Sequence, residues 1–486
     1  MPLPFLAHVY YTGYPTWLPE PLRLLKVLGT VGAVTLTKWY TSGRSNRSER
    51  NMHGRVVLIT GGTSGIGAAT TLELAQRGAQ IVLLTRLAPT DSFLVDYIDD
   101  LRTRTGNQMI YAEQVDLADL HSVRQFATKW IDNAPPRRLD MIVLCAATMV
   151  PPGSPRVETA EGVEVTWQVN FLANFHLLGI LSPAIRAQPF DRDVRIVIPT
   201  CSSYISAPKL DAGLDREGWT PQTAYARSKL ALMVFARAYQ KHLDAYKRPD
   251  QLPMTARVVL VDPGLARTPG MRRWLTRGSL WGLGLYLVFY VFAWLLLKSP
   301  EMAAQSVLFG VMESSLVRVP GGRLIKECME VDCARKDVDD EEVAKKLWEA
   351  SDKLIERVEK QQAVKRAKAK KEREKDEKKK EEEQKRDEEK KKTAAQVEEI
   401  EALVDAITRG KAKAAKEAKD GKQTYKKETQ ETTKKGGRKG NPSHLHPVFF
   451  TDKLRRPPFH IVAGPYTSPI AHGYVYQDGQ RGVTRL

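Results

Sequence analysis

The chain contains 486 residues, and its 75 lysine and arginine residues outnumber its 57 aspartate and glutamate residues, which gives a formal net charge of +18. This length exceeds one ordinary domain and allows a full α/β domain with extensions. The positive excess points to nucleic acid, an anionic membrane surface or a solvated basic tail, and the position of the charge along the chain must decide. The cysteines are too few for a disulfide-rich scaffold, suit a reducing compartment, and predict no metal site by their spacing: Cys145, Cys201, Cys328 and Cys333.

Residues 1–52 are expected to form a membrane-associating segment, and they lack the basic start of a cleavable signal peptide. The stretch 27–40 is apolar, but it is short and interrupted by glycine. A membrane-surface anchor, a marginal spanning helix and a helix packed on the protein body are all compatible with it. Aromatic and basic residues typical of membrane interfaces surround it and favour membrane association: Trp17, Arg23, Lys26, Lys38, Trp39 and Tyr40.

Short apolar runs alternate with helical patterns from residue 53 to residue 358, the expected catalytic domain. Six runs are interpreted as buried strands: RVVLITGG, QIVLLTR, MIYAEQVDL, LDMIVLCAA, DVRIVIPT and ARVVLVDPG. Each is nearly continuous in apolar residues, which is typical of a parallel sheet covered on both faces. The alternation of strands and helices predicts an α/β fold with a doubly wound parallel sheet of the Rossmann type.

The first strand leads into a glycine-rich turn and then a helix, in VVLITGGTSGIGAATTLELAQRG. Glycines permit positive φ angles and let backbone N–H groups approach a pyrophosphate at the start of a helix. The second strand ends at Arg86, where dinucleotide folds often place an acid for the ribose hydroxyls. A guanidinium suits a ribose 2′-phosphate instead, which predicts NADP rather than NAD; a surface arginine without a ligand is the alternative.

The stretch TAYARSKLALMVFA places Tyr225 and Lys229 four residues apart, on the same side of a helix. A chance pair on an amphipathic helix is one explanation. The other is proton transfer, because a phenol has a pKa of about 10 and a neighbouring cation lowers that pKa by favouring the phenolate.

Together these motifs resemble the short-chain dehydrogenase/reductase superfamily over roughly residues 53–358. The T-G-x-x-x-G-I-G turn, the Y-x-x-x-K pair and RVVLVDPGLARTP carry the resemblance, and SKLALMVFARAYQKHL and EEVAKKLWEASDKLI are similar to retinol-dehydrogenase-like members. The resemblance implies an alcohol/carbonyl oxidoreductase. In it, Tyr225 would be the general acid or base, Lys229 would lower its pKa and hold the nicotinamide ribose, and Asn170 would bend its helix and hold a water.

The resemblance also implies a set of cofactor-binding residues spread over the carboxyl ends of the strands. They are Gly61, Thr63, Ser64, Gly65, Ile66, Gly67, Arg86, Asp116, Leu117, Ala146, Asn170, Tyr225, Lys229, Pro263, Gly264 and Thr268.

Two segments depart from the family pattern. Residues 145–148 read C-A-A-T where the family carries N-N-A-G, although small residues still permit close approach of the cofactor. In RIVIPTCSSYIS, the family's serine, which hydrogen-bonds the substrate oxygen, has three candidates: Cys201, Ser202 and Ser203. A one-residue bulge beside Pro199 favours Ser202, whereas an ungapped count gives Cys201, whose thiol is a weaker donor.

The stretch 278–298 is expected to be a hydrophobic, membrane-associating insert. Residues 280–297 carry no charge and are rich in aromatic side chains, which makes them a transmembrane candidate; a buried core helix is the alternative. Because the Rossmann pattern resumes afterwards, a helical hairpin or a shallow membrane insertion beside the substrate entrance is favoured. A hydrophobic small molecule, namely a lipophilic alcohol, aldehyde or ketone, is the expected substrate.

The composition changes after residue 358. Residues 359–440 are dominated by lysine and glutamate, which predicts a charged tail that is either helical or disordered, with a short amphipathic patch at 394–410. Much of the positive excess lies in this tail, and residues 441–486 match no known pattern.

Two functions remain open from the sequence. The first is a membrane-associated NADP(H)-dependent oxidoreductase whose catalytic domain faces the cytosol, at the endoplasmic reticulum or a lipid droplet, alone or as a homodimer. The second is a catalytically weak cofactor-binding protein whose basic tail binds anionic membrane or RNA through phosphate charge. A tail that serves only as a solvated spacer is the third alternative.

Overall fold

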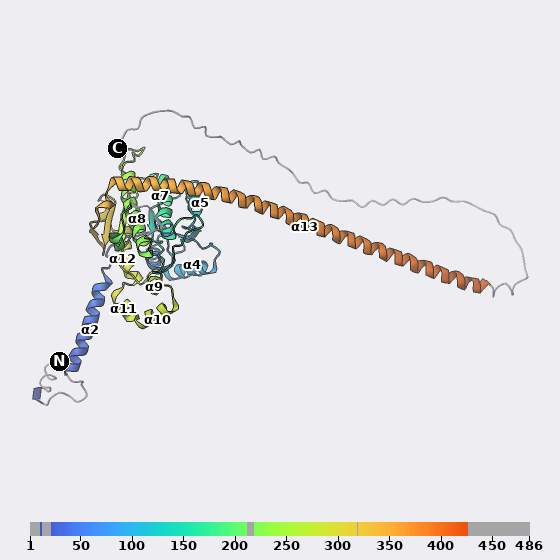
Figure 1. Ribbon diagram of the computed structural model, residues 1–486, viewed down its shortest axis with the longest axis horizontal. Helices are drawn as coiled ribbons and strands as arrows, with labels where there is room; N and C mark the ends of the chain where they lie inside the picture. Colours follow the sequence, from blue (N-terminus) through green and yellow to red (C-terminus); the bar gives the residue numbers. More distant parts are fainter. Residues whose placement is uncertain (1–9, 12–20, 211–217, 318, 426–486) are drawn as a thin grey trace, which may run out of the picture. The chain divides into compact units, whose positions relative to one another are not determined.

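The computed structural model describes residues 10–11, 21–210, 218–317 and 319–425 (Figure 1). Trp17, residues 426–440 of the expected tail and the segment 441–486 lie outside these ranges. The chain divides into two compact units, residues 1–381 and 382–486.

The first unit contains one eight-stranded sheet with the order β3-β2-β1-β4-β5-β6-β7-β8. Neighbouring strands are parallel except for β7 and β8, which are antiparallel. All six strands expected from the sequence are present, so the predicted doubly wound parallel sheet is confirmed, while the last two strands were not expected. The strands are β1 Val56–Thr60, β2 Gln80–Thr85, β3 Ile110–Gln114, β4 Met141–Leu144, β5 Val194–Pro199, β6 Ala256–Asp262, β7 Arg323–Lys326 and β8 Met329–Val331.

Helices cover both faces of this sheet, because successive strand residues point to opposite sides. In β1, Leu58 belongs to the core cluster on the side of α5, α7 and α8, whereas Val57 and Ile59 belong to the cluster on the side of α3, α4 and α12. The three neighbouring strands β1, β4 and β5 at the centre of the sheet are buried along their whole length, as their continuous apolar runs require. The covering helices are α3 Gly65–Gln76, α4 Ser92–Thr105, α5 Leu120–Ile131, α6 Val165–Trp167, α7 Ala173–Arg186, α8 Pro221–Asp244 and α12 Pro300–Met312.

The hydrophobic insert forms two short helices, α10 Leu280–Val288 and α11 Tyr290–Leu296, which lie next to α9 Pro269–Leu275 (Figure 1). No side chain of α10 or α11 is buried, and Leu280 and Trp281 are 86% and 92% exposed. The alternative of a buried core helix is therefore wrong. Within the described ranges, no helix is long and apolar enough to cross a membrane.

The C-terminal end of an N-terminal helix, α2 Pro21–Ser42, is hydrogen-bonded to this insert. Lys38 Nζ donates to the carbonyl oxygens of Trp294 at 2.7 Å and Leu297 at 3.2 Å, and Thr41 Oγ1 donates to the carbonyl oxygen of Leu295 at 2.6 Å. The earlier part of α2 exposes apolar side chains, among them Leu25, Leu28 and Val31. Thus α2 and α11 form one exposed apolar group of helices.

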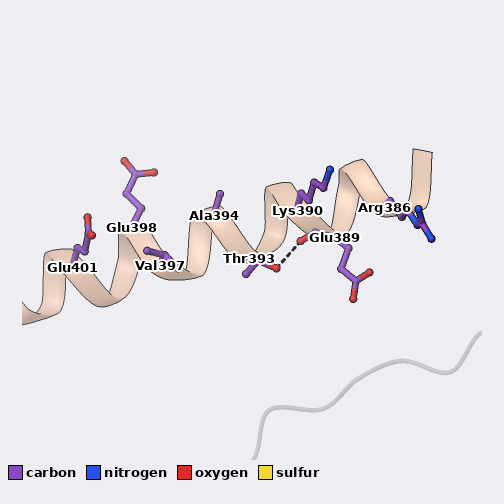
Figure 2. Close-up of a pocket in the computed structure, with 8 residues that line it drawn as sticks. All are labelled: Arg386, Glu389, Lys390, Thr393, Ala394, Val397, Glu398 and Glu401. Carbon is purple, nitrogen blue, oxygen red and sulfur yellow. Dashed lines mark hydrogen bonds between the residues drawn. The ribbon is translucent and has the colours of Figure 1, made fainter. Parts of the chain in front are cut away.

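The last helix, α13 Glu341–Tyr425, starts on the first unit. Its first turns pack on the sheet-covering helices: Leu347, Ile355 and Val358 are buried, and the Trp348 ring lies 5.2 Å from that of Phe175. In the second unit its described side chains are exposed, and Figure 2 shows a hollow lined only by successive turns of this helix, including Val397 between Lys390 and Glu401. This hollow contains none of the expected site residues.

Candidate active site

The glycine-rich turn after β1 forms the tight structure that the sequence predicts. Gly61 and Gly65 adopt φ angles of +66° and +56°. A side chain on Gly67 would overlap the carbonyl oxygen of Gly61, so this position needs glycine for the turn to pack on α3. Ser64 precedes α3 and makes no side-chain cap hydrogen bond, so the first N–H groups of the helix stay available to an anion. The first turn carries no acidic residue that would repel one.

Two contacts bring other segments to this turn. Thr268, from the segment after β6, lies so close that a β-carbon on Gly65 would come within 3.2 Å of its Cγ2 atom. The hydroxyl of Tyr97 on α4 donates to the carbonyl oxygen of Gly62 at 2.8 Å. The first contact joins two predicted site residues, while Tyr97 was missed because its partner lies 35 positions away.

Further predicted cofactor residues lie at the ends of neighbouring strands. Arg86 follows β2, which pairs with β1, and its side chain is exposed, with no ion pair to any residue that the structure describes. Asp116 follows β3 and accepts a hydrogen bond from the Ala118 N–H at 2.8 Å. After β4, the Ala146 N–H donates to Thr60 Oγ1 at 3.2 Å and thereby fixes the C-A-A-T loop beside the glycine turn.

Tyr225 and Lys229 lie on α8, which is started by a capping box between Thr220 and Thr223. The Lys229 ammonium lies 5.8 Å from the centre of the Tyr225 ring and donates to the carbonyl oxygen of Pro199 at 3.1 Å. Burial lowers the pKa of Lys229, although Cys201, Cys145 and Asp262 act in the opposite direction. The pair expected from sequence therefore stands at the carboxyl end of β5.

The pKa of Tyr225 is raised above its ordinary value, first by burial and then by Cys201 and Asp262. This direction is the opposite of what a proton-transfer group needs, because the phenolate is disfavoured next to negative or neutral groups in a dry site. Positive charge brought close to Tyr225 would lower its pKa again.

Asn170 connects the loop after β4 with α8. It lies fully buried in a wider helical turn, η1 Gln168–Leu172, inserted between α6 and α7. Its Oδ1 accepts from the Thr148 N–H at 2.7 Å, and its Nδ2 donates to the Thr148 carbonyl at 2.9 Å and to Ser228 Oγ at 3.0 Å. Ser228 in turn donates to the Tyr225 carbonyl at 2.8 Å. Asn170 thus supports the loop that lacks the family's own asparagines.

In the segment after β5, Cys201 and Ser202, two of the candidates for the family's serine position, have different partners. Ser202 donates to the buried carboxylate of Asp262, and Lys326 donates to Ser202 Oγ at 3.1 Å. The thiol of Cys201 lies close to the Tyr225 hydroxyl and contributes to raising its pKa. The sequence favoured Ser202 for the position opposite the tyrosine, and in the structure the hydroxyl of Ser202 is engaged by Asp262 of β6 and Lys326 of β7.

Asp262 and Lys326 were not identified from the sequence. They form an ion pair of 3.4 Å, and Asp262 Oδ1 also accepts from the Gly264 N–H at 3.0 Å. Asp262 could have been found from the sequence, because it directly precedes the predicted site residues Pro263 and Gly264. Lys326 could not, because the short strand β7 has no recognisable sequence pattern. A third group, Cys145, approaches Lys229, and burial raises the pKa of its thiol to about 12.

These residues fit a nicotinamide dinucleotide. The turn at Gly61 and Gly67 has no room for side chains, the start of α3 presents N–H groups without a competing acid, and Thr268 closes over the turn. Tyr225, Lys229 and Asn170 meet at the same edge of the sheet, at the carboxyl ends of parallel strands, where open α/β sheets bind their ligands.

Known proteins with the same pattern support this interpretation. The family model described as short chain dehydrogenase matches residues 55–277. The uncharacterized oxidoreductase pbr1 of Schizosaccharomyces pombe is 44% identical over 376 residues, 76% of this chain and 100% of that protein. Human retinol dehydrogenase 13 is 30% identical over 333 residues, 68% of this chain and 94% of that protein. Polyprenol dehydrogenase of Mus musculus is 33% identical over 303 residues, 61% of this chain and 82% of that protein. The chain therefore belongs to the short-chain dehydrogenase/reductase family, whose members are oxidoreductases that bind a nicotinamide cofactor, and it is a retinol-dehydrogenase-like member of that family.

Proposed function

We propose that the protein is an NADP(H)-dependent oxidoreductase that acts on a lipophilic alcohol, aldehyde or ketone at a membrane surface. The observation that carries this proposal is the position of Tyr225 and Lys229. They lie together on α8, with Asn170 bonded to the same helix and the glycine turn at the same edge of the sheet. A chance pair on a surface helix would not leave a lysine almost fully buried.

Proton transfer is assigned to Tyr225. When bound, the nicotinamide supplies the hydride acceptor or donor. The Tyr225 hydroxyl would give its proton to a carbonyl oxygen, or take one from an alcohol, and Lys229 would favour the phenolate by its charge. The Pro199 carbonyl holds the Lys229 ammonium in place, and the chain from Asn170 through Ser228 holds the backbone of α8 at Tyr225.

Hydrogen bonding to the substrate oxygen is assigned to Cys201. Its side chain already interacts with the Tyr225 hydroxyl, while Ser202 is engaged by Asp262 and Lys326. A thiol is a weak donor, so developing negative charge on the substrate oxygen would be stabilised less than by a hydroxyl. Slow turnover is the expected consequence.

The preference for NADP(H) rests on Arg86. Its exposed guanidinium, without an ion pair among the described residues, stands where β2 ends next to the glycine turn. A 2′-phosphate would give it a bidentate partner, whereas the two ribose hydroxyls of NAD would not.

The lipophilic substrate and the membrane location rest on the exposed apolar helices. α10 and α11 expose the large apolar side chains of Trp281, Leu285, Val288 and Phe292. Contiguous exposed apolar surface of this kind is typical of a membrane or protein contact site. Relatives named for retinol and polyprenol fit this chemistry. Free thiols and an interfacial group of helices suit a catalytic domain that faces the cytosol at the endoplasmic reticulum or a lipid droplet.

A second candidate function is supported by Cys201 and by the tail. If the weak thiol donor leaves the site nearly inactive, the protein would act as a cofactor-binding subunit. Its lysine-rich tail would then bind anionic membrane or RNA. The exposed described side chains of 382–415 are compatible with that role.

A spectroscopic assay separates the two functions. The full chain is purified in detergent, and NADPH absorbance is followed with hydrophobic aldehydes and ketones. Turnover that is lost in Tyr225→Phe but kept in Tyr111→Phe, an exposed tyrosine on β3, supports the oxidoreductase. NADPH binding without turnover of any substrate, together with loss of vesicle or RNA binding after deletion of residues 359–486, supports the second function.

A further inference from the structure

A pocket beside the hydrophobic insert shares Thr268 with the cofactor turn, but its two arginines have no part in the proposed reaction. It lies between α9, α10, α11 and the start of α12. Its lining includes two arginines, Arg267 and Arg272, and a set of apolar and aromatic side chains: Leu283, Tyr286, Leu287 and Tyr290. The pocket therefore combines two cations with an apolar wall.

Among the residues that the structure describes, no ion pair reaches Arg267 or Arg272. Arg267 donates to the Tyr290 hydroxyl at 2.7 Å, and its guanidinium lies 5.9 Å from the centre of that ring. Its Nε atom is buried and has no hydrogen-bond partner among the described residues. Glu301 also lines the pocket, but no ion pair joins it to either arginine in the part of the chain that the structure describes. An anion would relieve this unbalanced charge.

A further cation approaches from α2. Lys38 donates to two carbonyl oxygens of the insert, and its pKa is lowered by burial first and by Arg267 second. Lys38 and Arg267 therefore repel each other at the junction of α2 and α11. The same junction carries the exposed apolar side chains of both helices.

The pocket also joins the insert to the cofactor turn. The two ends of the insert are connected by a pair of backbone hydrogen bonds, from the Arg267 N–H to the Lys298 carbonyl and from the Lys298 N–H to the Leu265 carbonyl, each 2.9 Å. Thr268, next in the chain, packs against Gly65. A ligand held by Arg267 would thus contact the hydrogen-bonded segments at residues 265–267 and 298, which join the insert to the catalytic body.

We propose that this pocket binds the phosphate of an anionic membrane lipid, whose acyl chains lie along α10 and α11. Arginines placed at the polar end of exposed apolar helices stand at the depth of lipid phosphates, and a guanidinium binds phosphate through two parallel hydrogen bonds. This inference rests on the proposed membrane-bound function. In addition to apolar contact, a lipid headgroup would then hold the insert where it joins the catalytic body.

The test compares two arginine pairs of equal charge. The full chain is mixed with vesicles of phosphatidylcholine alone or with one fifth phosphatidic acid, and bound protein is measured by flotation. Arg267→Gln/Arg272→Gln removes the pocket pair, and Arg273→Gln/Arg277→Gln removes two exposed arginines that do not line the pocket. We expect the pocket variant to bind the anionic vesicles about tenfold more weakly than the control variant. Equal losses in the two variants would overturn the proposal, because the charge would then act without a site.

Arginine labelling identifies what occupies the pocket. Phenylglyoxal modification of Arg267 and Arg272 is mapped by mass spectrometry with each vesicle type, with inorganic phosphate and with NADPH. Protection by phosphatidic acid vesicles alone supports the proposal. Equal protection by inorganic phosphate would assign the pocket to a soluble phosphate compound, and protection by NADPH without lipid would assign it to the cofactor; either outcome contradicts a lipid site.

The failure of this inference is distinguishable from failure of the proposed function. Wild-type protein that binds neither vesicle type would contradict the membrane location itself. Wild-type protein that binds both vesicle types equally, while Tyr225-dependent NADPH turnover persists in detergent, would contradict only the headgroup site.

Discussion

Ser202 donates a hydrogen bond to Asp262, while the side chain of the neighbouring Cys201 lies close enough to the Tyr225 hydroxyl to raise its pKa. Asp262 is buried and also pairs with Lys326, so the serine hydroxyl is held by two charged groups. A hydroxyl that already donates to a carboxylate is less free to donate to a substrate oxygen.

Exchange of Cys201 tests this arrangement. Because a hydroxyl is a stronger donor than a thiol, Cys201→Ser is expected to raise kcat by about tenfold, and Cys201→Ala to lower it. Ser202→Ala should act mainly on stability, through loss of the Asp262 contact. NADPH turnover and thermal unfolding of the three variants provide the measurement. Turnover abolished by Ser202→Ala but unchanged in Cys201→Ala would show that Ser202 contacts the substrate.

Arg86 is expected to set the choice of cofactor. Arg86→Gln removes the charge offered to a 2′-phosphate, so the Kd for NADPH should rise by about 10- to 100-fold while the Kd for NADH stays the same. Fluorescence titration with both cofactors measures this ratio. Arg104→Gln, a substitution of an exposed arginine on α4, is the matched control. A parallel loss for both cofactors would instead indicate a general weakening of the site.

Asn170 is expected to act as a positioning residue. Asn170→Ala removes three hydrogen bonds that join Thr148 and Ser228, and it leaves buried polar groups unpaired. We expect the free energy of unfolding to fall by about 2–4 kcal/mol and kcat to fall more than KM changes. Ser228→Ala, which removes the Asn170 link to α8 and the hydrogen bond to the Tyr225 carbonyl but leaves the Thr148 loop bonded to Asn170, should lower kcat by less. A normal kcat in Asn170→Ala that remains folded would exclude this role.

Glu161 is expected to make stability depend on pH near neutrality. Its carboxylate accepts hydrogen bonds from the Leu120 N–H and from Gln168, yet burial raises its pKa to about 7, with Asp119 acting in the same direction and Arg366 against it. A raised pKa means that the folded state holds more protons between pH 4.5 and pH 7 than the unfolded state does. Stability is therefore greatest below this window and falls as the pH rises through 7.

Glu161→Gln should remove this dependence. At pH 8 the variant should be more stable than the wild type by roughly 1 kcal/mol, after solvent screening of a partly accessible group. At pH 5 the difference should vanish or reverse. Denaturant unfolding at both pH values is the measurement, with Glu349→Gln on the exposed face of α13 as control. A wild-type stability that does not fall between pH 5 and pH 8 would contradict the shifted pKa.

The sequence by itself determined those features of the protein that depend on short stretches of consecutive residues. Continuous apolar runs specify strands buried on both faces, glycines specify the turn before α3, and a spacing of four places Tyr225 and Lys229 on one side of α8. Each of these signals needs only a few consecutive residues, and the six strands and the family were accordingly predicted correctly. The exposed apolar insert could be located in the same way, but not its division into α10 and α11.

Only the tertiary structure decided which side chains meet. The partners of Ser202 lie 60 and 124 residues further along the chain, on β6 and β7. No pattern of apolar and polar residues in the sequence predicts these contacts. Strand β7 has just four residues, too few for a clear pattern. The orientation of Cys201 toward Tyr225 and of Ser202 toward Asp262 follows from the pairing of β5, β6 and β7 in one sheet. Such a pairing joins segments distant in the sequence, and its free energy comes from burial and charge rather than from local backbone preference.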